Sequence, residues 1–108
     1  MITGKNYIGN EMSAIGSVRF KTMDPKMNSE NEWTCFEATT KEIHSSVDKA
    51  WKAFKVFRNT SQVQRSTFLN AIADEIEALG DVLLDTYCKE SGLPKGRAIG
   101  ERGRTIFQ

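Results

Sequence analysis

The first 38 residues alternate apolar and polar positions over short runs, which predicts strands and turns rather than helix. The first two runs cover residues 6–8 and 17–20, and the turn dipeptide Gly9-Asn10 follows the first of them. We expect these two runs to pair as a hairpin with a long loop. Residues 26–32 read as a polar loop, and residues 33–37 alternate again, which predicts a third strand.

From residue 39 the apolar spacing changes to that of a helix. Thr39 followed by Glu42 is a capping box, in which each side chain accepts a hydrogen bond from a free backbone amide. Apolar residues then recur at helical spacing and form a broad face, and residues 58–60 end the helix. This face consists of Ile43, Val47, Ala50, Trp51, Phe54 and Phe57.

Three more helices follow. Ser61 with Gln64 repeats the capping box, and the second apolar stripe consists of Phe68, Leu69, Ile72, Ala73, Ile76 and Leu79. Gly80 is placed to end this helix and Asp81 to cap the third, whose inward positions are Leu83, Leu84, Tyr87 and Cys88. Residues 91–92 stop the third helix, and Pro94 fits the first turn of a fourth.

The fourth helix has a face almost without side chains, because Gly96, Gly100, Gly103 and Phe107 lie on it together. Each interior glycine costs a helix roughly 0.5–1 kcal/mol relative to alanine. Two explanations remain open: close packing of this face against a helix or sheet, or a face that lines a ligand channel. The chain ends at Gln108 without a stop signal, so we expect it to be cut inside a structural element.

Composition is that of a globular chain, and together with the elements above it predicts an α+β fold with short strands followed by about four helices. The formal net charge of +1 excludes binding to nucleic acid through a general basic excess. The basic cluster of Lys95, Arg97, Arg102 and Arg104 is interrupted by Glu101 and lacks interleaved aromatic residues. No apolar run is long enough for a membrane span, and the first five residues do not open a signal peptide.

Candidate chemical groups are few. Cys35 and Cys88 stand 53 positions apart without ligand spacing, so we interpret them as reduced packing residues in a cytoplasmic protein. His44 is the single histidine and has no paired ligand, which excludes a metal site built around it. Neither a GxGxxG nor a GxxxxGK[ST] motif occurs, so no phosphate cradle is predicted.

Three segments carry a resemblance to a known family. Residues 50–54 (AWKAF), 72–77 (IADEIE) and 90–94 (ESGLP) match, in order and spacing, the N-terminal segment of the aldehyde dehydrogenase superfamily. The tail from Gly92 is similar to a narrower branch, the 2,5-dioxovalerate (α-ketoglutarate semialdehyde) dehydrogenases. The residues that carry this second likeness are Gly92, Leu93, Pro94, Arg97, Gly100, Glu101, Gly103, Arg104, Thr105 and Gln108.

The resemblance implies a parent enzyme that oxidises an aldehyde to the acid with NAD or NADP, through a cysteine thiolate and a glutamate-activated water. Residues 1–38 would be strands and turns, and residues 39–108 the helical part of an α/β dinucleotide-binding domain that is truncated at Gln108. No residue of this chain matches the catalytic or cofactor-binding residues. We therefore expect the chain alone to be inactive and to bind no cofactor.

One site follows from the branch. Its substrates carry a carboxylate distant from the aldehyde, and in the superfamily the helix after ESGLP runs beside the substrate entrance. Arg104, with Arg97 or Gln108, is our candidate for binding that carboxylate, because a guanidinium matches it with two hydrogen bonds. The competing interpretation is that both arginines pair with Glu101.

The expected partners are the remainder of the dehydrogenase fold and further copies of the chain, which would associate through exposed apolar helix faces. We expect neither nucleic acid nor a membrane as a partner. The alternative function is an independent helical interaction module with dehydrogenase ancestry and no catalysis.

Overall fold

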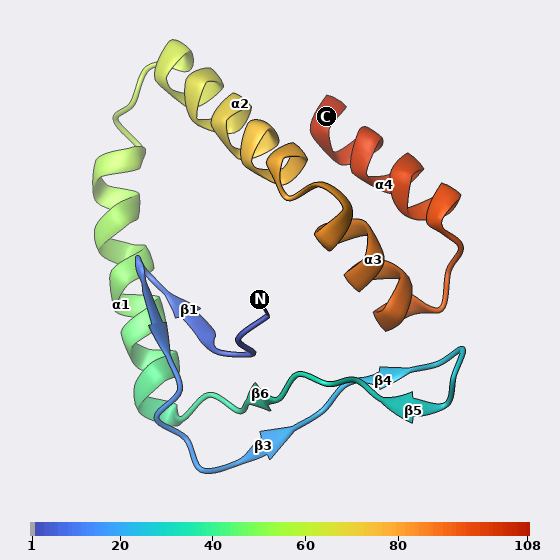
Figure 1. Cartoon of the computed structure of the whole chain (residues 1–108). Coiled ribbons are helices and arrows are strands. Elements are labelled where there is room, and N and C mark those ends of the chain that lie inside the picture. Colours follow the sequence, from blue (N-terminus) through green and yellow to red (C-terminus); the bar gives the residue numbers. More distant parts are fainter. Residues whose placement is uncertain (1) are drawn as a thin grey trace. The chain divides into compact units, whose positions relative to one another are not determined.

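The computed structural model describes residues 2–108, in which short strands are followed by four helices (Figure 1). This order confirms the α+β prediction. The chain divides into a hairpin unit, residues 2–22 and 30–60, and a helical unit, residues 23–29 and 61–108. The expected boundary at residue 38 concerns the domains of the family fold and stays a prediction.

The hairpin unit begins with a tighter hairpin than the sequence suggested. β1 (Asn6–Ile8) pairs antiparallel with β2 (Glu11–Ser13), so that Asn6 faces Ser13 and Ile8 faces Glu11. Gly9 has φ +64°, the left-handed conformation that two-residue hairpin turns need at their first position. The predicted pairing of 6–8 with 17–20 is therefore wrong, because the Gly9-Asn10 turn closes the ribbon at once.

The second run pairs further along the chain instead. β3 (Arg19–Phe20) is antiparallel to β6 (Cys35–Phe36), and the Arg19 guanidinium lies 5.1 Å from the centroid of the Phe36 ring. The expected third strand at 33–37 is thus present but is limited to two residues.

The segment read as a polar loop contains part of another ribbon. β4 (Met23–Asp24) pairs with β5 (Ser29–Glu30), and the turn between them is held by Asp24. Its Oδ1 accepts hydrogen bonds from the amides of Lys26 and Met27 at 2.9 and 3.0 Å. An aspartate that mimics a backbone turn in this way brings the flanking residues together. The prediction of a loop without strands over residues 26–32 was therefore wrong.

The capping boxes were predicted correctly. α1 (Thr40–Phe57) begins after Thr39, and both hydrogen bonds of its box with Glu42 are present. α2 (Gln62–Ala78) begins after Ser61 with the equivalent pair of bonds to Gln64. Satisfying the free amides of the first turn fixes where each helix starts.

The third helix starts without a side-chain cap. α3 (Gly80–Ser91) follows Leu79 directly, and Gly80 has φ +55°, which lets the chain change direction between α2 and α3. Asp81 lies in the first turn and accepts no capping bond, so its prediction as a cap is wrong. Its carboxylate binds Lys95 instead.

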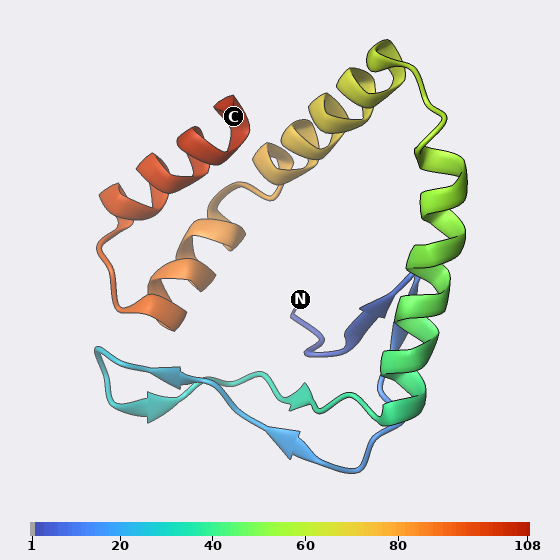
Figure 2. The same cartoon turned by 180° about the vertical axis from the view of Figure 1, so that it is seen from behind.

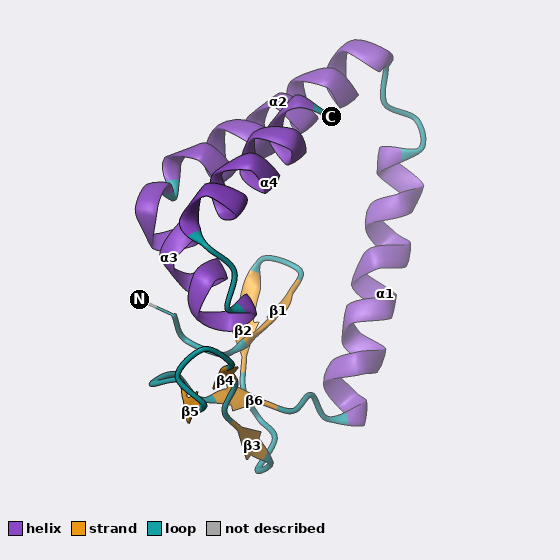
Figure 3. Ribbon diagram, turned by 90° about the vertical axis from the view of Figure 1, so that its right-hand side faces the viewer, coloured by secondary structure: helices purple, strands orange, loops and turns teal. Residues whose placement is uncertain are grey.

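The fourth helix, α4 (Lys95–Phe107), folds back along the unit and packs against α2 and α3 (Figures 2 and 3). Gly92 ends α3 with φ +70°, as expected of a C-cap glycine. Pro94 is the N-cap residue of α4, one position earlier than predicted. Leu84 of α3 and Ala98 of α4 are the buried apolar residues of this unit, and Ile8 is the buried one of the hairpin unit.

Candidate functional site

The polar face of α4 carries the residues predicted to meet a substrate. Arg97 and Glu101 are four positions apart, and Nη2 of Arg97 lies 3.1 Å from Oε1 of Glu101. This ion pair confirms half of the competing interpretation, that the arginines pair with Glu101. Arg97 is therefore engaged within its own helix.

Arg104 differs from Arg97. Its side chain is exposed, and within residues 2–108 its guanidinium makes no ion pair. The structure thus separates the two arginines, and Arg104 keeps all its donors available to an anion. Gln108 lies one turn further, where its amide donates to the Arg104 carbonyl at 3.1 Å.

A groove of about 600 Å³ runs between α2 and the last turn of α4. Gln108 lines it, whereas Arg97 and Arg104 do not. Its walls are formed by Gln62, Arg65, Ser66, Leu69, Asn70, Ile72, Ala73 and Ile76 of α2 and by Thr105, Ile106, Phe107 and Gln108. This groove therefore does not bring the three residues of the predicted site together.

The glycine face of α4 is open within the helical unit. A Cβ atom built on Gly96, Gly100 or Gly103 meets no atom within 4 Å. Phe107, on the same face, leaves 92% of its surface exposed. Within the helical unit no element packs against this face, as expected if its partner belongs to other residues of the family fold, and the choice between close packing and a channel lining stays a prediction.

A salt-bridge cluster that the sequence analysis missed holds the start of α4. Nζ of Lys95 lies 3.0 Å from Asp81 and 3.1 Å from Asp85, which are one turn apart on α3. The hydrogen bonds that Lys95 donates to Asp81 and, next in size, to Asp85 raise the pKa of Lys95 above its ordinary value of 10.5. The four-residue spacing of the two aspartates was the available signal, but their cation lies on another helix.

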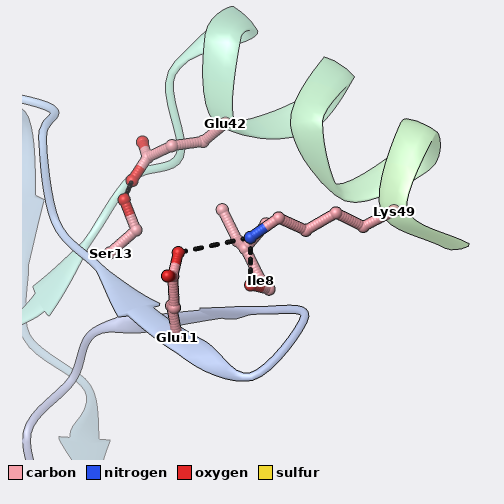
Figure 4. Close-up of polar contacts among 5 residues, drawn as sticks. All are labelled: Ile8, Glu11, Ser13, Glu42 and Lys49. Atoms are coloured by element: carbon pink, nitrogen blue, oxygen red, sulfur yellow. Dashed lines mark hydrogen bonds and ion pairs between the residues drawn. The ribbon is translucent and has the colours of Figure 1, made fainter.

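Glu42 is the most constrained polar side chain of the hairpin unit, with 3% of its surface exposed (Figure 4). Its Oε2 accepts from the amide of Thr39 at 2.8 Å, as the capping box requires, and from the Thr39 hydroxyl at 2.9 Å. Its Oε1 accepts from the Ser13 hydroxyl and from the amide of Ile15. The carboxylate therefore ties the start of α1 to the end of β2.

This network stabilises the charged form of Glu42. The hydrogen bond from Ser13, followed by that from the Thr39 amide, lowers the pKa of Glu42 from 4.5 to about 2, although burial opposes the shift. Sequence reasoning identified Glu42 only as part of a cap. The contacts of Glu42 with Ser13 and Ile15 depend on the pairing of β1 with β2. The sequence had predicted a different partner for β1.

Lys49 fastens α1 to the same hairpin from the next turns of the helix. Its Nζ donates to the carbonyl of Ile8 at 3.2 Å and lies 3.3 Å from Oε2 of Glu11 (Figure 4). Both attachments of α1 to β1 and β2 are thus polar. Their arrangement indicates a structural role.

The described residues offer little redox or metal chemistry. Cys35 and Cys88 are free and half-buried, and residues 2–108 contain no group of three or more His, Cys, Asp or Glu side chains placed to hold a metal ion. No helix in the described part of the chain is long and apolar enough to cross a membrane.

Comparison with known proteins decides the family. The sequence profile of the aldehyde dehydrogenase family matches residues 13–107. The chain belongs to the aldehyde dehydrogenase family. It is 37% identical over 108 residues to alpha-ketoglutaric semialdehyde dehydrogenase 2 of Azospirillum brasilense, covering 99% of this chain and 21% of that protein.

A second relative agrees. This member of the aldehyde dehydrogenase family is 31% identical over 105 residues to alpha-ketoglutaric semialdehyde dehydrogenase of Acinetobacter baylyi, which covers 97% of the chain and 20% of the relative. The chain thus spans about a fifth of the length of these curated relatives. No solved structure matches it at a significant level.

The family implies a dinucleotide cofactor, whose phosphates bind free main-chain amides at the start of a helix. Gly100 and Gly103 lie inside α4, where main-chain amides are engaged in the helix rather than free to bind phosphate. The strands of residues 2–108 form two-stranded ribbons, not a parallel sheet with a glycine-rich turn. The described residues therefore do not fit a dinucleotide.

Proposed function

We propose that this chain is the N-terminal part of an NAD(P)-dependent aldehyde dehydrogenase that oxidises a carboxylated semialdehyde, such as 2,5-dioxovalerate, to the acid. The observation that carries the proposal is the 37% identity over 99% of the chain to an enzyme named for α-ketoglutaric semialdehyde. A free-thiol chain of this kind suits a cytoplasmic enzyme.

In this proposal the chain contributes structure, and the chemistry belongs to the rest of the enzyme. When bound, the nicotinamide cofactor accepts the hydride that leaves the aldehyde carbon. Neither Cys35 nor Cys88 serves as the nucleophile, since each lies half-buried on an element that packs within its unit. We therefore expect the 108-residue chain alone to oxidise no aldehyde.

A segment exchange tests the proposal. The matched segment of the Azospirillum enzyme would be replaced by these 108 residues, and formation of reduced cofactor would be measured with α-ketoglutaric semialdehyde. We expect an active exchanged enzyme, whereas the isolated chain with the same substrate and either NAD or NADP should form no reduced cofactor. A folded exchanged enzyme without activity, or an active isolated chain, would contradict the proposal.

Within this enzyme we assign Arg104 to the distant carboxylate of the substrate. Arg104 suits this role better than Arg97 because its guanidinium is not engaged by Glu101. A hydrogen bond to a charged group contributes about 1.5–3 kcal/mol, which corresponds to roughly 10- to 150-fold in affinity.

The residue assignment has its own test in the exchanged enzyme. Arg104→Met should raise the KM for the semialdehyde at least about tenfold relative to the KM for propanal, which has no carboxylate. Arg97→Met is the matched control on the same helix and should change the two KM values equally. Equal effects of Arg104→Met on both substrates would refute the assignment and leave the proposed enzyme class intact.

A further inference from the structure

We draw no further inference here: the strongest candidate, the open groove of the helical unit between α2 and the last turn of α4, is an unpartnered and partly apolar face, and nothing in the structure shows what covers it.

Discussion

Replacing the three glycines of α4 by alanine should stabilise this chain. A Cβ atom at Gly96, Gly100 or Gly103 meets nothing within 4 Å, so the substitutions introduce no clash. Each removes a conformational entropy cost of roughly 0.5–1 kcal/mol, and together they should raise the free energy of unfolding by about 1.5–3 kcal/mol. At about 4–8 °C per kcal/mol, a rise in Tm of roughly 6 °C or more is expected.

The measurement is thermal and urea unfolding of the 108-residue chain, followed by far-ultraviolet circular dichroism at one fixed protein concentration. Gly92→Ala is the control with the opposite sign. At Gly92 φ is +70° and a Cβ would lie 3.0 Å from Cγ of Pro25, so alanine should destabilise the chain by about 1 kcal/mol or more.

A triple variant with unchanged or lower stability would refute the argument, since it would mean that α4 is already covered in the isolated chain. The same three substitutions in the exchanged enzyme should have the opposite effect. There we expect the glycine face to pack against the rest of the fold, where added methyl groups typically cost about 1–3 kcal/mol.

Two further predictions concern charged groups. Because the folded-state pKa of Glu42 is lowered to about 2, the stabilising contribution of its carboxylate is complete above pH 4.5 and is lost as pH falls towards 2. Glu42→Gln should therefore lower the urea midpoint at pH 7 and flatten the loss of stability in acid. The control Glu37→Gln, at an exposed position, should change neither. Because the pKa of Lys95 is raised, the contribution of its ion pairs to stability is complete below its ordinary pKa of 10.5 and is lost as pH rises through the raised value. Lys95→Met should lower the urea midpoint at pH 7, and added salt should reduce the difference from the parent chain. Lys26→Met is the control for this variant. A Glu42→Gln variant with the parent's acid profile, or a Lys95→Met variant whose loss is insensitive to salt, would contradict these assignments.

The helices were predictable because their signals are local. Thr39 with Glu42 and Ser61 with Gln64 determine the helix starts from four residues each, and Gly92 ends α3 through its own backbone preference. These interactions lie within one turn of the chain, so the amino-acid order alone contains them.

Strand pairing and the polar networks were not predictable in the same way. β3 and β6 contribute two residues each, and their paired residues are 15 and 17 positions apart in sequence, which leaves no alternation long enough to specify a partner. The contact of Glu42 with Ser13, and that of Lys95 with Asp81, join elements whose adjacency depends on the fold. The candidate site was predictable in part. The four-residue spacing predicted the Arg97–Glu101 ion pair, but only the structure shows that Arg104 is not paired with Glu101.

The placement of residues 23–29 in the helical unit determines how this chain can be divided. The chain leaves the hairpin unit after Thr22, returns at Glu30 and leaves again after Thr60, so neither unit is a continuous stretch of sequence. A cut between Thr60 and Ser61 would therefore separate α3 from β4, which packs against it. Truncations designed at the helix boundaries would each lack a piece of the unit they were meant to isolate, and a circular permutation or a peptide supplied in trans would be needed to obtain either unit whole.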